Sequence, residues 1–92
     1  METRFYVCGL GYDANGYISD YDQHFGDFDT YEDAYELFVK LQCRNVESFF
    51  ENISGINQLL IQLEECEETD DAIICIDIKN EWWIDNPNFK EV

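Results

Sequence analysis

The first part of the chain has the hydrophobic pattern of two strands joined by a tight turn. Residues 5–10 are rich in aromatic and β-branched side chains, and residues 17 to about 24 alternate between two faces of mixed polarity. Between them lies Asn15-Gly16, a pair typical of two-residue hairpin turns because both positions accept a positive φ. We therefore predict a β-hairpin whose return strand has a hydrated, negatively charged outer face.

A helix is predicted next, beginning after Thr30, whose hydroxyl can cap the first turn. Apolar residues then recur at helical spacing at Ala34, Leu37, Phe38 and Leu41. Acidic residues lie near the start of this segment and basic residues near its end, which is the arrangement that the helix dipole favours.

A second apolar stripe follows, with intervals of four, three, four and three residues, at Phe49, Ile53, Ile56, Leu60 and Leu63. The spacing is helical, but Gly55 interrupts the stripe and Ser54 is a residue type that caps a new helix. We therefore predict a second helical segment in two pieces, with residues 46–52 forming a separate turn.

The last part of the chain reads as a second hairpin. Residues 72–78 are apolar on both faces, which is typical of a central strand covered on both sides. Lys79-Asn80 is the predicted turn, and residues 81–84 form the return strand before Pro87. The expected fold class is α+β, with an antiparallel sheet of about four strands in two hairpins. Two helical segments pack on one face, in a single domain of residues 1–92.

Charge changes the picture more than any other property. The chain has 21 acidic and 5 basic residues, a formal net charge of −16. Like charges on a small domain repel one another, so such an excess reflects either adaptation to high salt or a use for the field. The fifteen aromatic residues are more than a halophilic surface usually carries, and we favour the second interpretation.

The sign of the charge also selects among partners. Nucleic acids and anionic membrane surfaces attract basic patches, so direct binding to either is not expected. The sequence shows no secretory segment after Met1 and no apolar run near 18 residues. We expect a cytoplasmic protein, monomeric or homodimeric, whose partner is a basic protein.

A calcium loop is one explanation for the alternating residues Asp20, Asp22 and His24. An EF-hand loop needs glycine at its sixth position and glutamate at its twelfth, but here the glycine comes one residue late and Tyr31 stands at the twelfth. No flanking helix is predicted before the loop, and histidine is a poor ligand for a hard cation. We predict no metal site here.

Catalysis has little support in the sequence. No phosphate-binding glycine loop, nucleophile elbow or metal-spaced cluster is present. His24 is the only histidine, and among so many carboxylates some pair will lie close together by chance. We expect no catalytic residues, no cofactor and no enzymatic activity.

The cysteines do not form a metal-binding motif in the sequence. Cys8, Cys43, Cys66 and Cys75 lie far apart, without a CxxC pair. A reduced cysteine in an apolar strand behaves as a small hydrophobic residue. We expect all four to be reduced and buried, with a disulfide or a zinc site as the less favoured alternatives.

Two acidic blocks and several aromatic residues remain as candidates for partner binding. The first block is Asp20, Asp22, Asp27, Asp29, Glu32, Asp33 and Glu36, and the second is Glu64, Glu65, Glu67, Glu68, Asp70 and Asp71. Tyr21, Trp82 and Trp83 are the aromatic candidates, because tyrosine and tryptophan often anchor interfaces and adjacent strand residues such as the tryptophans point to opposite faces.

In size, charge and aromatic content, the whole chain resembles the small acidic inhibitors that phages and mobile elements encode. Anti-CRISPR and antirestriction proteins belong to this class, and some of them act as DNA mimics in the DNA-binding cleft of a nuclease. The resemblance includes no family motif and therefore implies no individual functional residue. It implies a stoichiometric inhibitor of a defence nuclease, with a CRISPR effector such as Cas9 as the first target to consider.

Two other functions fit the same composition. An immunity protein or antitoxin that neutralises a basic toxin would use the same electrostatic attraction. A non-enzymatic acidic adaptor domain would carry the charge only as a solvated surface.

Overall fold

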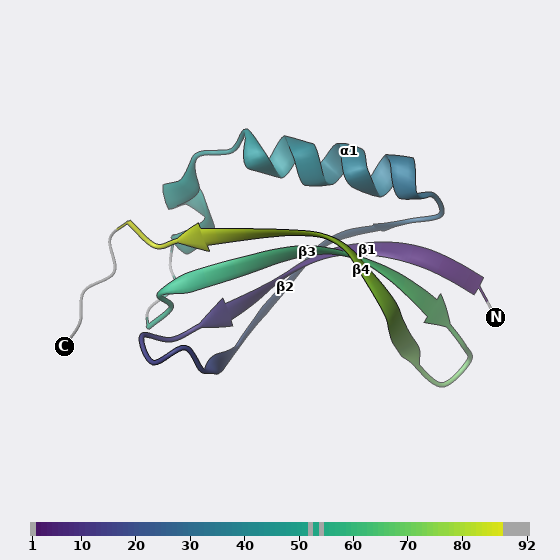
Figure 1. Cartoon of the computed structure of the whole chain (residues 1–92), viewed down its shortest axis with the longest axis horizontal. Helices are drawn as coiled ribbons and strands as arrows, with labels where there is room; N and C mark the ends of the chain where they lie inside the picture. The colour runs from purple at the N-terminus through teal and green to yellow at the C-terminus, as the bar shows by residue number, and fades with distance from the viewer. Residues whose placement is uncertain (1, 52, 54, 88–92) are drawn as a thin grey trace.

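The computed structural model of the chain describes residues 2–51, 53 and 55–87, without the side chain of Asp20. The elements in chain order are β1 (Glu2–Tyr12), β2 (Ile18–Phe28), α1 (Tyr31–Gln42), η1 (Val46–Phe50), β3 (Gln58–Glu68) and β4 (Ile73–Asp85). The strands form one antiparallel sheet in the order β2-β1-β3-β4, and α1 lies along one face (Figure 1). The predicted α+β class and the four-stranded antiparallel sheet are confirmed.

The first hairpin forms where the sequence predicts it. The Asp13 carboxylate accepts hydrogen bonds from the backbone N–H groups of Asn15 at 2.9 Å and Tyr17 at 3.0 Å. Gly16 has a φ of +82°, a value that glycine tolerates and that residues with a side chain rarely adopt. Both strands are longer than predicted, because β1 begins at Glu2 and β2 continues to Phe28.

The first helix also follows the prediction. The Thr30 hydroxyl accepts a hydrogen bond from the Asp33 N–H at 3.3 Å and so caps the first turn of α1. Ala34, Phe38 and Leu41 are buried on the side that faces the sheet. The opposite side of the helix remains in solvent.

The prediction of a second helical segment is wrong. Among the residues described after α1, only η1 is helical, as a short 3₁₀ turn, and Gln58–Glu68 forms β3 between β1 and β4. Leu59, Ile61 and Leu63 are buried on the side of α1, while Leu60 and Gln62 are buried on the other side. Such a continuously buried run fits a helix and a central strand equally well in the sequence, and its place between two strands decides the outcome. Asn52 and Ser54 lie outside the described residues.

The second hairpin exists, but its position differs from the prediction. Its turn lies at residues 69–72, where the Thr69 N–H donates to the Ala72 carbonyl at 2.9 Å. Residues 73–85 form one strand, β4, at the edge of the sheet, and Lys79 falls within a register shift instead of a turn. A second shift lies near Cys66, and bulges of this kind bend a strand. The β3–β4 turn accordingly bends away from α1 (Figure 1).

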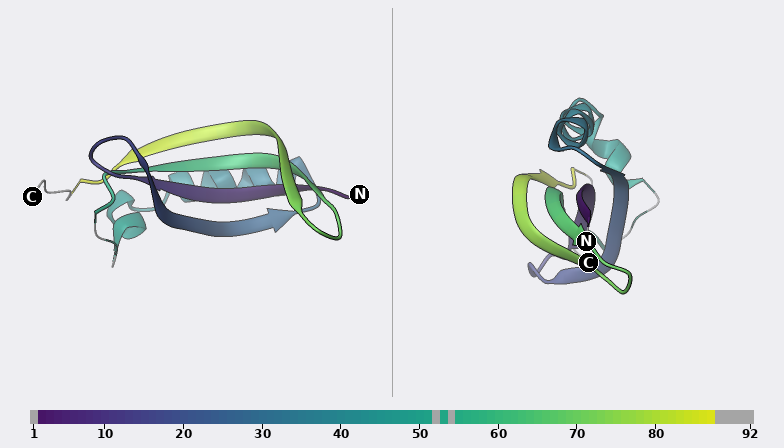
Figure 2. Two further views of the ribbon diagram at one scale, coloured as in Figure 1. Left: turned by 90° about the horizontal axis from the view of Figure 1, so that it is seen from below. Right: turned by 90° about the vertical axis from the view of Figure 1, so that its right-hand side faces the viewer.

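The main core lies between the sheet and the helical segments. It contains Val7, Ala34, Phe38, Leu41, Phe49, Phe50, Ile56, Leu59, Ile61, Leu63 and Ile84. The sheet is curled around this core, with α1 and η1 on the same side (Figure 2). Among the described residues, no helix has the length and apolar character that a membrane crossing requires.

Candidate acidic interface

The first acidic block extends from β2 onto the outer side of α1. Asp20 and Asp22 lie on β2, an extended strand, so the segment does not form the loop that an EF-hand requires. Asp22 is exposed. The remaining acids of the block are Asp27 at the end of β2, Asp29 beside the helix cap, and Glu32, Asp33 and Glu36 on α1. Tyr21 is half-buried and packs against the core, so only part of its ring is available to a partner.

The second block lies on β3 and on the turn that follows it. Successive strand residues point to opposite faces, so Glu64 and Glu68 lie on the face away from α1, whereas Glu65 and Glu67 lie on the other. All four are half-buried, and the turn residues Asp70 and Asp71 are exposed.

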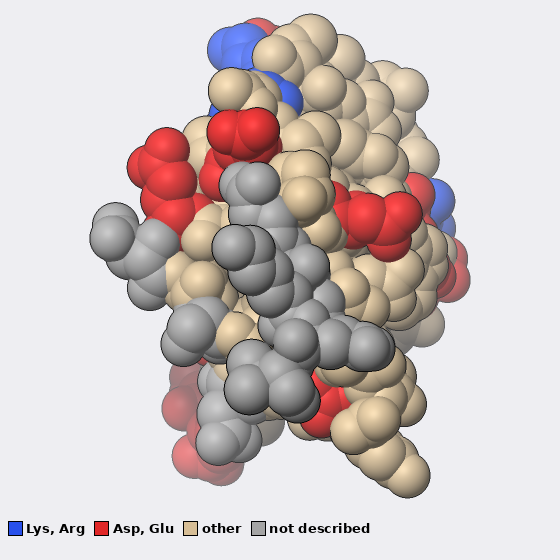
Figure 3. Space-filling model, turned by 90° about the vertical axis from the view of Figure 1, so that its left-hand side faces the viewer, with Lys and Arg blue, Asp and Glu red and all other residues tan. Residues whose placement is uncertain are grey.

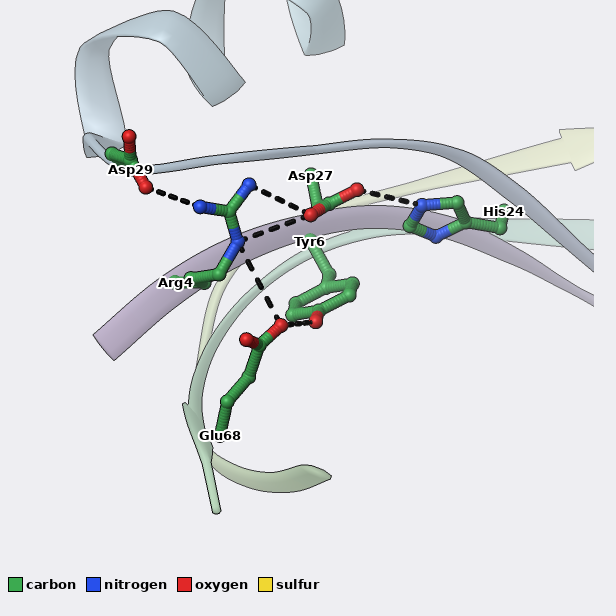
Figure 4. A network of polar contacts seen from close by, with 6 residues as sticks. All are labelled: Arg4, Tyr6, His24, Asp27, Asp29 and Glu68. Carbon is green, nitrogen blue, oxygen red and sulfur yellow. Dashed lines mark hydrogen bonds and ion pairs between the residues drawn. The ribbon is translucent and has the colours of Figure 1, made fainter. Parts of the chain in front are cut away.

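Arg4 on β1 brings the two blocks together. Its Nε and Nη2 donate to Asp27 Oδ2 at 3.0 and 2.7 Å, and its Nη1 donates to Asp29. On the other side, Arg4 Nε lies 3.7 Å from Glu68 Oε1, and the Tyr6 hydroxyl donates to the same carboxylate. Figure 4 shows these side chains converging from β1, β2 and β3. Part of each block therefore forms a polar network that ties the strands together.

The network changes the ionisation of its members. Hydrogen bonds from Arg4, and secondarily from His24 at 3.2 Å, lower the pKa of Asp27. The hydrogen bond to Glu68 and partial burial raise the pKa of Tyr6 to about 12. The bond to Asp27 likewise raises the pKa of Arg4. Asp27 thus stays ionised in acid, and Tyr6 stays neutral well into the alkaline range.

Of the basic residues that the structure describes, Arg4, Lys40 and Lys79 form ion pairs with acids of the chain. Lys40 lies 3.2 Å from Glu36 on α1, and Lys79 lies 2.9 Å from Asp77 and 3.5 Å from Glu65. Among the described side chains, ion pairs engage Asp27, Asp29, Glu36, Glu65, Glu68 and Asp77. Within the same described set, no ion pair engages the other block members Asp22, Glu32, Asp33, Glu64, Glu67, Asp70 and Asp71.

At the end of the molecule that Figure 3 shows, the carboxylates lie in separate groups. In the view of Figure 3, which faces the end with the β1–β2 turn, acidic groups alternate with uncharged side chains, and basic residues lie at the margins. The molecule is elongated, with extents of 46 × 28 × 19 Å. An extended partner surface can therefore contact several acidic groups along its length.

The edge strand β4 adds an apolar feature that the sequence did not predict. Ile73, Ile74, Ile76 and Ile78 have exposed fractions of 59, 52, 47 and 37%. Their segment was expected to be a covered central strand, but it lies at an edge and bends away from the helix that would cover it. An exposed apolar edge strand is a site at which another chain can add or pack.

The two tryptophans divide between core and surface, as the strand alternation predicts. Trp82 packs edge-on against Phe49, with ring centroids 5.9 Å apart. Trp83 is exposed and lies 5.1 Å from the Tyr12 ring on the opposite face. Of the pair, Trp83 is the one that a partner can reach.

The structure also brings together side chains of a kind that bind metals. One oxygen of Glu64 and the sulfur atoms of Cys66 and Cys75 lie within 4.8 Å of one another. The thiols are free, but only Cys66 is fully buried, and Cys43 and Cys75 are exposed. The expectation that all four cysteines would be buried is therefore wrong.

Comparison of the chain with protein-family models, with curated proteins and with solved structures gave no match. The candidate residues are accordingly assigned from their own geometry and charge.

Sequence reasoning missed Arg4 and the isoleucines of β4 as parts of this surface. Arg4 had one available signal, since it is a lone base in a strand of a chain that has only 5 basic residues. A buried or half-buried base among acids generally binds several of them. The isoleucines had no such signal, because their exposure depends on the bend of β4.

Proposed function

We propose that this protein is a stoichiometric inhibitor that binds the basic, nucleic-acid-binding cleft of a nuclease and competes there with DNA. The first target to test is a CRISPR effector nuclease. The observation that carries the proposal is the acidic surplus that remains after the internal ion pairs are counted, displayed on a sheet and a helix that hold it in place.

The physical basis is competition for the same cations. Duplex DNA presents one negative charge per ~1.7 Å of axis, and a cleft that binds it lines its walls with lysine and arginine. Carboxylates on rigid elements can form ion pairs with these lysine and arginine side chains without the entropy cost of ordering a flexible acidic tail. Electrostatic steering by a charge of −16 also accelerates association.

The test is titration of a purified CRISPR effector nuclease with this protein while DNA cleavage is measured. Cleavage is expected to stop near one molecule of inhibitor per nuclease, and association rates should fall as salt rises, since steering decays over a Debye length of about 8 Å at physiological salt. Nuclease that is first loaded with duplex DNA should resist inhibition, because the cleft is already filled.

Variants with neutral side chains distinguish the contribution of the two acidic blocks to binding from the contribution of the overall negative charge. One variant carries Asp22→Asn, Glu32→Gln and Asp33→Asn, and a second carries Glu67→Gln, Asp70→Asn and Asp71→Asn. The matched control removes the same number of charges at exposed positions outside both blocks, with Glu47→Gln, Glu51→Gln and Glu81→Gln. At least one block variant should bind ten or more times more weakly than the control, because charged interface pairs commonly contribute about 1.5 kcal/mol or more. Equal binding by all three variants would refute the role of the acidic blocks.

A second candidate is an immunity protein that neutralises a basic toxin. The exposed isoleucines of β4 favour it, because an apolar strand edge beside acidic groups suits a protein surface of mixed character. The two functions differ in one measurement. Excess duplex DNA should displace the protein from a nuclease cleft, whereas binding to a toxin that does not bind DNA should be unaffected.

A further inference from the structure

Three side chains on the second hairpin form a compact donor set on the sheet face away from α1. Cys66 and Cys75 stand directly opposite each other in the β3–β4 ladder, and Glu64 lies two residues from Cys66 on the same face. Cys66 Sγ lies 3.8 Å from Glu64 Oε2, and all three donor atoms lie within 4.8 Å of one another. The three donors therefore come from two paired strands, β3 and β4, and not from a single flexible loop.

We propose that Glu64, Cys66 and Cys75 bind a thiophilic divalent cation, with Zn²⁺ as the natural candidate. Two sulfur donors and one carboxylate suit Zn²⁺, which takes Cys sulfur at about 2.3 Å and carboxylate oxygen at about 2.0 Å in tetrahedral sites. Donors of such a tetrahedron lie about 3.3 to 3.8 Å apart, so side-chain movements of about 1 Å close the set around an ion.

The surroundings favour this chemistry over binding of a hard cation. Thiolates select soft or borderline metals, whereas Ca²⁺ and Mg²⁺ require oxygen ligands. Cys66 is 2% exposed, so one sulfur is fixed within the sheet, while Cys75 is exposed and leaves a path for entry. The excess of negative charge on the chain raises the local concentration of cations.

A third cysteine, Cys8, borders the set. Cys8 on β1 lines a surface hollow of about 340 Å³ together with Asp22, His24 and Glu64. Its partner in the β1–β3 ladder is Gln62, which lies two residues from Glu64 and on the same face. Cys8 is thus placed to supply the fourth ligand, and otherwise solvent completes the tetrahedron.

A bound cation would cross-link the part of the sheet that α1 leaves uncovered. The register shifts that bend β4 lie between Cys75 and the region packed under the helix, and the isoleucines of this half of the strand are exposed. An ion bound to both β3 and β4 fixes that bend, and because it binds the folded state it stabilises the protein.

The experiment uses the full chain, reduced and kept free of oxygen, titrated with CoCl₂ and followed by absorption spectroscopy. We expect saturation at one Co²⁺ per chain, a near-ultraviolet thiolate-to-Co²⁺ charge-transfer band, and displacement by ZnCl₂. Cys66→Ser and Cys75→Ser should each weaken binding by about 100-fold or more, and Glu64→Gln by about tenfold. Cys43→Ser is the matched control and should bind like the parent protein, because Cys43 follows α1, away from the site.

Two further measurements keep the result decisive. Since Cys66 is buried, circular dichroism checks that Cys66→Ser folds, and Cys75→Ser tests the site at an exposed position. Zn²⁺ should raise the melting temperature of the parent protein and of Cys43→Ser but not of Cys75→Ser. Absence of the charge-transfer band, its persistence in both serine variants, or a Cys66–Cys75 disulfide in protein isolated from a reducing cytosol would overturn the proposal.

Discussion

The two halves of β4 both carry large apolar side chains and pair with the same strand, but their environments differ. In the second half, Ile84 is buried, Trp82 packs on Phe49, and Asn80 accepts a hydrogen bond from the Tyr31 hydroxyl at 2.8 Å. In the first half, the isoleucines of residues 73–78 are exposed. The difference arises because the bulges bend the first half away from α1. Pairing in a ladder does not bury a side chain unless another layer covers it.

What replaces apolar packing at the uncovered end is polar chemistry. Arg4, Tyr6 and Glu68 join β1 to β3 there, and Asp27 extends the network to β2. Cys66 and Cys75 face each other across the same hairpin. At this end of the sheet the strands are joined by ion pairs, hydrogen bonds and facing cysteine side chains. At the covered end they are joined by the packing of buried apolar side chains.

The largest expected effect comes from truncating one isoleucine in each half of β4. Ile84→Ala removes a side chain that is 3% exposed from the core and should cost about 2 to 5 kcal/mol in the free energy of unfolding. Ile76→Ala makes the same chemical change at a position that is 47% exposed and should cost less than about 1 kcal/mol. Urea denaturation measures both.

The comparison would fail if the two variants lost similar stability. A large loss in Ile76→Ala would mean that the first half of β4 is covered in solution, by a second copy or by a rearranged hairpin. Sedimentation at the same protein concentrations distinguishes these explanations.

Local signals explain which elements the sequence could predict. The Asn15-Gly16 turn and the Thr30 cap depend only on residues that are a few positions away in the sequence, and both elements formed as expected. Residues 56–63 could not be assigned in this way, since the intervals between Ile56, Leu60 and Leu63 suit a helix as well as a buried strand. Only the pairing with β1 and β4, which is distant in sequence, resolves the choice.

The candidate site shows the same division. The sequence contains the acidic blocks, but it does not reveal that Arg4 lies between them, because that contact depends on the β1–β3 register. It also could not pair Cys66 with Cys75, since a helical segment and not a strand was predicted before residue 72.

A second, smaller effect should follow from removing the cation of the polar network. Arg4→Met leaves the carboxylates of Asp27, Asp29 and Glu68 near one another without a positive charge, so the melting temperature should fall clearly. Lys40→Met is the control, because its exposed pair with Glu36 should contribute about 0.5 kcal/mol or less. Arg4→Lys should restore only part of the loss, since lysine cannot make the forked contacts.

The acid side of this prediction has a defined sign. Arg4 lowers the pKa of Asp27, so that contribution to stability is present above the unfolded pKa of about 3.9 and is lost as the pH falls through the lower folded value. The stability difference between the parent protein and Arg4→Met should therefore be greatest near neutral pH and should shrink below about pH 4. A difference that is constant across this range would show that Arg4 acts through packing and not through its charge.

The smallest expected effect concerns Tyr6, which binds Glu68 at the uncovered end and has a pKa raised to about 12. A raised folded pKa means that the contribution of the neutral phenol is fully present below the unfolded pKa of about 10 and is lost as the pH rises through about 12. Tyr6→Phe removes this hydroxyl but keeps the aromatic ring, whose centroid lies 5.5 Å from that of the His24 ring. At pH 8 the variant should be less stable by about 1 kcal/mol or less, because a hydrogen bond of a partly buried group contributes a modest net free energy. Between pH 10 and 12 the parent protein should lose that advantage, so the two stability curves should converge.

Tyr17→Phe, at an exposed position in the β1–β2 turn, provides the control and should follow the parent curve throughout. If the Tyr6→Phe curve instead stayed parallel to that of the parent protein up to pH 12, the Tyr6–Glu68 hydrogen bond would not contribute to holding β1 against β3, and the uncovered end would have to be stabilised by the thiol site or by Arg4 alone.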